Sequence, residues 1–205
     1  MTTRIGLISD VHATPAPVEE ALALFEQQGI EQVCCLGDIA GYGTELIPTL
    51  DLLRQNDCQS ILGNHEQWYL DEHADDEAAS YFQTLPVSRQ VNIEDVSIYM
   101  VHASPPDSTM DGIRLLDEQG KGILVQRLAW AGELESFDYD VLIVGHTHQV
   151  FCERLGNTLV INPGSTLFNH SCAILTLPDC TVEFLPLSDK QIRTTFNWRG
   201  GLPGL

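Results

Sequence analysis

The stretch LISDVHATPAP, residues 7–17, places Asp10 and His12 directly after an apolar run. In an extended chain, side chains two residues apart point to the same side. A carboxylate and an imidazole are therefore presented together where a predicted buried strand ends. The prolines that follow break the chain into a loop, so the two side chains stand at a strand-to-loop junction.

Apolar runs and helical patterns alternate over the first 65 residues. Strands are predicted at 4–9, 32–37 and 58–63, and helices at 17–29 and 44–56. Alternation of this kind is typical of βαβ units, in which successive strands run parallel in one sheet. The N-terminal third of the chain therefore predicts an α/β fold.

The rest of the chain is less regular. Its predicted elements are a helix over 71–85, a strand over 96–102, an irregular insertion over 103–119, a helix over roughly 121–135 and a strand over 140–145. From residue 149, short strands separated by Gly156-Asn157 and Pro178-Asp179 indicate antiparallel hairpins. The chain shows neither a linker nor a repeat, so we expect one domain covering residues 1–205.

The chain is strongly acidic, with a formal net charge of −19 and only two lysines, Lys121 and Lys190. Binding to the phosphates of a long nucleic acid requires clustered basic residues, which this sequence lacks. The same charge repels anionic lipids, and no apolar run is long enough for a membrane span. We therefore expect neither long nucleic acids nor membranes as partners.

The N-terminal residues run straight into a strand and lack the basic and apolar regions of a signal peptide. The six cysteines show no C-x-x-C spacing, and most lie in apolar runs. This argues against a zinc–thiolate site and favours buried free thiols. We expect a cytoplasmic protein.

Five predicted strands end in groups that can bind a metal ion. These groups are Asp10 and His12, Asp38, Asn64 and His65, His102, and His146 and His148. In open α/β sheets, ligands bind outside the carboxyl ends of the strands. Each motif alone has an ordinary reading: the GD pair as a turn, or GNHE as a helix start capped by Asn64. Their joint occurrence at strand ends predicts a site at one edge of the fold.

The motifs D-x-H, G-D-x-x-G, G-N-H-E, a lone strand-end histidine and G-H-T-H resemble those of the calcineurin-like metallophosphoesterase superfamily. GDIAGYG and NPGS (162–165) make the resemblance strongest to its small bacterial members, the YfcE-like phosphodiesterases. The resemblance covers residues 5 to about 187. It implies a four-layer α/β/β/α sandwich, with two mixed β-sheets flanked by helices.

The resemblance also implies two divalent metal ions. One would be bound by Asp10, His12, Asp38 and His148, and the other by Asp38, Asn64, His102 and His146, so that Asp38 bridges them. His65 matches a histidine that lies near the metals and acts as an acid or as a transition-state contact. Imidazoles and carboxylates without thiolates suit Mn, Fe, Zn, Co or Ni.

The reaction implied is attack of a metal-bound hydroxide on the phosphorus of a small phosphorylated substrate, either a phosphodiester or a phosphomonoester. Two divalent ions carry four positive charges and the two aspartates cancel two, so the site attracts anions inside an acidic protein. Specificity would depend on the insertion 103–119 and on the loop 164–171.

Two alternatives remain open at this point. One is a hydrolase of dinucleoside polyphosphates, and the other is a non-catalytic scaffold similar to a retromer subunit of the same superfamily. The GD loop departs from that of protein Ser/Thr phosphatases, because Gly41 and Tyr42 replace its aspartate and arginine. The sequence gives no view of the oligomeric state.

Overall fold

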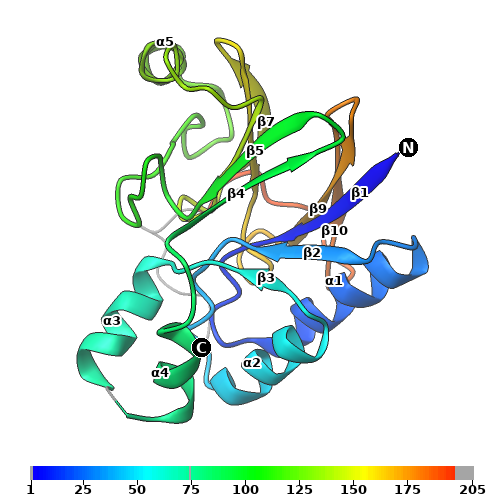
Figure 1. Cartoon of the computed structure of the whole chain (residues 1–205), viewed down its shortest axis with the longest axis vertical. Coiled ribbons are helices and arrows are strands. Elements are labelled where there is room, and N and C mark those ends of the chain that lie inside the picture. Colours follow the sequence, from blue (N-terminus) through cyan, green and yellow to red (C-terminus); the bar gives the residue numbers. More distant parts are fainter. Residues whose placement is uncertain (1, 74, 197–205) are drawn as a thin grey trace.

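Two five-stranded β-sheets pack face to face, and helices cover their outer faces (Figure 1). The structure is a computed structural model that describes residues 2–73 and 75–196. Each sheet contains both parallel and antiparallel neighbours. The predicted four-layer α/β/β/α sandwich with two mixed sheets is therefore confirmed.

The first sheet has the strand order β10-β9-β1-β2-β3. Its strands are β1 (Thr3–Ile8), β2 (Gln32–Cys35), β3 (Gln59–Ser60), β9 (Ser171–Leu177) and β10 (Thr181–Pro186). The three N-terminal strands are parallel, whereas β9 runs antiparallel to both β1 and β10. The predicted βαβ units and the hairpin at Pro178-Asp179 are both confirmed.

The second sheet has the order β4-β5-β6-β8-β7. Its strands are β4 (Ser88–Ile93), β5 (Val96–Val101), β6 (Val141–Ile143), β7 (Val150–Leu155) and β8 (Thr158–Pro163). The central strands β5, β6 and β8 are parallel, and the two edge strands pair with them antiparallel. As predicted, Gly156-Asn157 forms the turn of the hairpin between β7 and β8.

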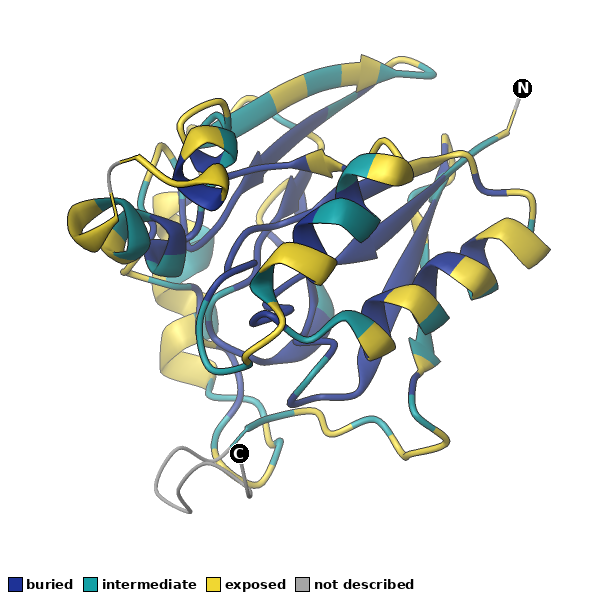
Figure 2. Ribbon diagram, turned by 90° about the horizontal axis from the view of Figure 1, so that it is seen from below, coloured by how far each residue is buried: buried dark blue, intermediate teal, exposed yellow. Residues whose placement is uncertain are grey.

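Successive side chains of β1 pack on opposite faces of the first sheet. Ile5 and Leu7 point into the core between the sheets, whereas Ile8 packs under the helices. Gly6 faces the helices too, and a Cβ there would lie 2.6 Å from the ring of Phe25. The glycine thus lets α1 (Pro15–Gln27) approach the sheet closely, and Figure 2 shows the buried strands behind helices with exposed outer faces.

The single helix predicted over 71–85 is wrong. The chain instead forms α3 (Asn64–Glu72) and a separate α4 (Glu77–Phe82). Asp76 starts the second helix, because its carboxylate accepts a hydrogen bond of 2.8 Å from the backbone N–H of Ala79. An aspartate of the acidic run therefore caps the second helix.

Strand β4 was not predicted. Its sequence SRQVNI contains only two apolar residues, Val91 and Ile93, and none of its residues is fully buried. An edge strand of this kind has almost no apolar alternation, and its pairing with β5 defines it. The two-residue connection, Glu94 and Asp95, has positive φ at both positions, as tight hairpins require.

The remaining helices are α2 (Leu46–Gln55), which packs beside α1 on the first sheet, and α5 (Leu124–Glu133), which lies on the second. The insertion 103–119 forms no helix or named strand within the part of the chain that the structure describes. Among the described helices, none combines the length and apolar composition that crossing a bilayer requires.

Candidate metal centre

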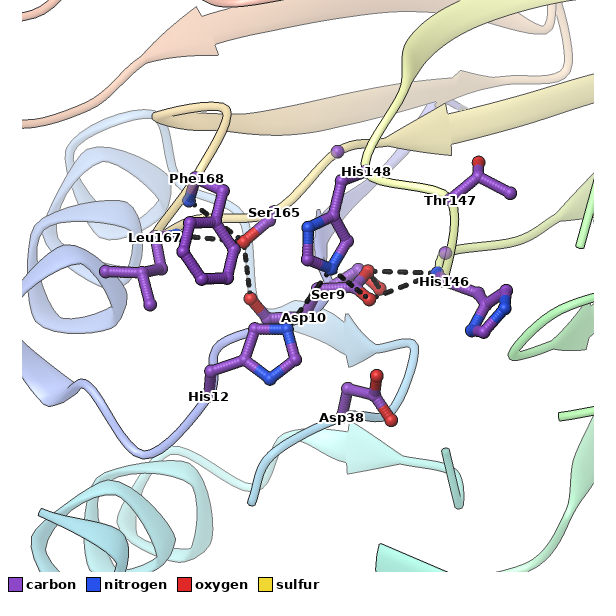
Figure 3. Close-up of polar contacts among 12 residues, drawn as sticks. Ser9, Asp10, His12, Asp38, His146, Thr147, His148, Ser165, Leu167 and Phe168 are labelled. Atoms are coloured by element: carbon purple, nitrogen blue, oxygen red, sulfur yellow. Dashed lines mark hydrogen bonds and ion pairs between the residues drawn. The ribbon is translucent and has the colours of Figure 1, made fainter. Parts of the chain in front are cut away.

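Asp10, His12 and His148 form the first part of the site, and all three side chains are buried. Nε2 of His148 lies 3.2 Å from Oδ1 of Asp10 and 3.1 Å from Nε2 of His12. Figure 3 shows the three side chains turned toward a common point, with Asp10 and His12 following β1 and His148 following β6. Two imidazole nitrogens and a carboxylate oxygen thus converge, as metal coordination requires.

Asp38, His102 and His146 form the second part. Oδ1 of Asp38 lies 3.3 Å from Nε2 of His102. The side-chain oxygen of Asn64 lies 3.2 Å from that same nitrogen and 2.9 Å from Nδ1 of His146. These four groups follow β2, β3, β5 and β6, so both sheets contribute.

The structure therefore brings together all seven residues predicted as metal ligands. Asp38 also lies within one cluster with His12 and His65. This places its carboxylate between the first group and the second, as a bridging role requires. The roles of these residues as metal ligands stay a prediction, which the geometry fits.

Five of the seven side chains are held by strained backbone. The residues with positive φ are Asp10, His12, Asp38, His146 and His148, with values between 47° and 63°. A left-handed conformation costs a non-glycine residue roughly 1–2 kcal/mol. Strain of this kind persists where the surrounding structure enforces it, and it concentrates at functional sites. Here it turns each side chain inward at the point where its strand ends.

Glycine is required at two positions where neighbouring loops of the site come into contact. A Cβ at Gly63 would overlap the Asp38 carboxylate, and a Cβ at Gly145 would overlap Ser9 and Asp10. The glycines in GNHE and GHTH therefore let neighbouring strand ends approach within contact distance.

Glu66 is a supporting residue that the sequence analysis missed. Its carboxylate is fully buried and accepts three hydrogen bonds, from the backbone N–H groups of Gly63 (2.7 Å), Asp38 (2.8 Å) and Ala40 (2.7 Å). One side chain thus joins the GD loop to the start of α3. The only signal was its place in GNHE, which does not reveal partners 26 and 28 residues away.

Two serines donate hydrogen bonds to Asp10. Ser9 donates to Oδ2 of Asp10 at 2.5 Å, and Ser165 donates to the Asp10 backbone carbonyl at 2.6 Å. The backbone N–H of His146 also points at both oxygens of the carboxylate, at 3.1 Å (Figure 3). The NPGS segment noted in the sequence therefore acts at the site through Ser165.

The protonation states of the first group favour cation binding. Burial alone would raise the pKa of Asp10, but His148 and the other imidazoles outweigh it and hold that pKa far below its usual range. Burial, together with the neighbouring His148, lowers the pKa of His12 to about 3. An ionised carboxylate and a neutral imidazole are the forms that bind metal ions.

His102 differs from the other histidines. Burial would lower its pKa, but the Asp38 carboxylate outweighs burial and raises the pKa to about 10. Burial would likewise raise the pKa of Asp38, and His102 reverses that effect. A metal ion at this position would therefore displace the imidazole proton.

His65 lies at the rim of the centre. Its backbone N–H donates to Oδ1 of Asp38 at 3.0 Å, and its Nε2 lies 3.9 Å from Oδ2 of the same carboxylate. The imidazole packs edge-on against His12, with 4.9 Å between ring centroids. Burial lowers its pKa, which favours the neutral ring. His65 is thus adjacent to the site, as predicted.

The donor set fits divalent transition metals. Two carboxylates, one amide oxygen and four imidazoles face each other, which matches the hard-to-borderline ligands of such ions. The donors form two groups, and Asp38 of the second group also clusters with His12 of the first. The number and identity of the ions stay part of the proposal below.

A profile of the calcineurin-like phosphoesterase superfamily domain matches residues 3–178. A phosphodiesterase of Methanocaldococcus jannaschii is 27% identical to this chain, with 93% of this chain and 96% of the relative covered.

Solved structures show the same fold. A hypothetical protein of Pyrococcus horikoshii superposes with a TM-score of 0.70 at 18% identity, covering 93% of this chain and 89% of the other. The YfcE phosphoesterase from E. coli gives a TM-score of 0.55 at 18% identity, covering 91% of this chain and all of the other. The profile match spans most of the sequence, and its family comprises metal-dependent hydrolases of phosphoester bonds, the enzyme class predicted from the motifs. The chain belongs to the calcineurin-like phosphoesterase superfamily.

Proposed function

We propose that this protein hydrolyses a P–O ester bond in small phosphorylated molecules, phosphodiesters or phosphomonoesters, with two divalent transition-metal ions. The observation that carries the proposal is the convergence of seven side chains, from the ends of five strands, into two groups that are linked through Asp38. The relative named a phosphodiesterase supports the same reaction class.

In this proposal one ion is held by Asp10, His12, Asp38 and His148, and the other by Asp38, Asn64, His102 and His146. Mn, Fe, Zn, Co and Ni all suit these donors. When bound, such ions lower the pKa of water and withdraw charge from phosphoryl oxygens. The protein's contribution is to hold Asp38 between the two groups, which Glu66 does through the loop backbone.

His65 is the one predicted functional side chain that lies outside the two ligand groups. Its ring stands 3.9 Å from the Asp38 carboxylate, and it is partly accessible to solvent. From there its N–H can reach a phosphoryl oxygen or the departing ester oxygen of a phosphate at the centre. We assign it to proton donation or hydrogen bonding in the transition state.

The acidic charge of the chain is consistent with this function. With a net charge of −19, the surface repels large polyanions. Two divalent ions would make the centre locally cationic, because only two carboxylates, Asp10 and Asp38, lie among the proposed ligands. The proposed substrate is therefore small and carries few phosphates.

The scaffold alternative requires that catalytic groups are dispensable. This chain retains every ligand type and keeps five of them in strained backbone, which a protein-binding platform does not need. A dinucleoside-polyphosphate hydrolase shares the proposed centre and differs only in the groups around it, so substrate tests must separate it.

The test combines metal content with a substrate panel. The protein is stripped with chelator, reloaded with Mn or Zn, and analysed for bound metal. It is then assayed with bis(4-nitrophenyl) phosphate, 4-nitrophenyl phosphate and a dinucleoside tetraphosphate. We expect two ions per chain and turnover of an aryl ester. Preferential turnover of the tetraphosphate would favour the polyphosphate hydrolase, and a metal-free, inactive protein would favour the scaffold.

A further inference from the structure

Two large apolar side chains are exposed near the candidate metal centre. The side chain of Trp68 is 48% exposed and that of Met110 is 52% exposed. Tryptophan is on average a strongly buried residue, and exposed apolar groups next to a binding site commonly contact a ligand. Their position relative to His65 and the metal ligands indicates what they contact.

Trp68 stands directly outside His65. Both lie on α3, three residues apart, and therefore on the same face of the helix. The centroids of the indole and the imidazole are 4.8 Å apart, with 59° between the ring planes. Since His65 itself lies against the Asp38 carboxylate, the indole is the next group outward from the candidate metal centre.

Met110 belongs to the insertion 103–119, which is fixed against the site at two points. Thr109 donates to the side-chain oxygen of Gln67 at 2.7 Å, which ties the insertion to α3. Gly112 lies against His146, where a Cβ would be only 2.7 Å from the imidazole. Met110 lies between these anchors, and the Thr109–Gln67 bond joins the residues that immediately precede Met110 and Trp68.

The charges of this segment oppose a second phosphate. Asp107 and Asp111, on either side of Met110, are both exposed, and Arg114 is the one basic residue of the insertion, against four acidic ones. On this side of the centre, apolar contact therefore strengthens the binding of a ligand group, and negative charge on that group weakens it. A flat, uncharged ring satisfies both conditions and can stack on the open face of the indole.

We propose that Trp68 and Met110 form a subsite for an aromatic group, an aryl ring or a nucleobase, carried by a phosphoester whose phosphate binds at the metal centre. The inference rests on the proposed function and names its substrate class. Base–aromatic stacking contributes about 1–3 kcal/mol, so the ring should tighten binding roughly 5- to 150-fold.

Two phosphonates that differ only in the ring test this directly. Phenylphosphonate and methylphosphonate present the same anionic head to the centre, and calorimetric titration of the Mn-loaded protein measures both affinities without turnover. We expect phenylphosphonate to bind roughly 5- to 150-fold more tightly. Trp68→Ala should reduce this ratio to near unity, Trp68→Phe should keep part of it, and Met110→Ala should reduce it less.

A matched control is Leu128→Ala, which removes another exposed apolar side chain (65%) from α5, on the second sheet. It should leave the ratio unchanged. Equal affinities for the two phosphonates in a protein that hydrolyses bis(4-nitrophenyl) phosphate would overturn the subsite and leave the proposed function standing. An unchanged ratio in Trp68→Ala would also overturn it. If neither phosphonate binds and no ester is hydrolysed, the proposed function fails, and the subsite fails with it.

Discussion

The Glu66 carboxylate accepts a hydrogen bond of 2.8 Å from the backbone N–H of Asp38, the residue proposed to bridge the two ions. The same buried carboxylate also accepts from Gly63 and Ala40. Three donors on two separate loops thus depend on one acceptor. The position of the proposed bridging aspartate therefore depends on a side chain that is not among the proposed ligands.

Glu66→Gln should therefore weaken both folding and metal binding. An amide has only one acceptor oxygen and turns N–H groups toward backbone N–H donors. Loss of one or two such hydrogen bonds costs about 2–4 kcal/mol, or roughly 5–15 °C in Tm. Thermal denaturation and elemental analysis would measure the two effects. Glu72→Gln, an exposed change on the same helix, is the control; if both variants matched the wild type, the supporting role would be wrong.

Asp38→Asn should remove both ions. The substitution deletes one negative charge from the point between two groups of ligands, so each cation is left poorly compensated. His12→Ala should leave the second ion in place, because His12 belongs only to the first group and to the cluster with His65. Bound metal per chain, after equilibration with Mn and removal of the excess, distinguishes the two patterns.

The control for the charge change is Asp71→Asn, which lies exposed on α3. It should retain the metal content of the wild type. An Asp38→Asn protein that keeps two ions and full activity would show that another residue bridges them.

Substitution by alanine should have opposite effects on stability at two glycines. Gly132 lies exposed in α5 with no atom within 4 Å of an added Cβ, so Gly132→Ala should stabilise the protein by about 0.5–1 kcal/mol through higher helix propensity. Gly41 has φ of +117°, and a Cβ would lie 2.5 Å from Nδ1 of His65. Gly41→Ala should lower both Tm and activity. Chemical denaturation measures the first effect, and equal stability of the two variants would contradict the structural argument.

The sequence predicted the site well because its ligands lie at strand ends. The Asp10-x-His12 and His146-x-His148 pairs each follow an apolar run, so local pattern and topology agree on where they lie. Glu66 could not be predicted, since its role depends on loops that meet only in the folded chain. The exposure of Trp68 likewise depends on the folded chain, whereas its contact with His65 is local, between residues three apart on α3.

Elements with weak local signals were also missed. Strand β4 depends on pairing with β5, and the break before α4 depends on a single capping aspartate, Asp76. In both cases the decisive interaction is a hydrogen bond rather than an apolar pattern. Val91 and Ile93 of β4 are only partly buried against the core between the sheets, so the apolar pattern that periodicity detects is weak in this strand.

His65→Ala should keep both metal ions and lose most of kcat. His65 is partly accessible to solvent, and its Nε2 lies 3.9 Å from the Asp38 carboxylate. It belongs to neither of the two proposed ligand groups. A single acid–base or hydrogen-bonding group typically contributes about 10²–10⁴-fold. His73→Ala, an exposed histidine just after α3, provides the matched control and should leave both metal content and kcat unchanged.

The dependence on leaving group separates the two roles of His65. Burial lowers its pKa, and a neutral imidazole keeps one N–H that can donate to a phosphoryl oxygen. If it instead protonates the departing oxygen, esters with poor leaving groups should lose far more rate than nitrophenyl esters, because nitrophenolate departs without a proton. Equal losses across a series of methyl, phenyl and nitrophenyl esters would exclude the acid and assign transition-state stabilisation. Loss of bound metal in the same variant would show that His65 is a ligand, as its clustering with His12 and Asp38 permits.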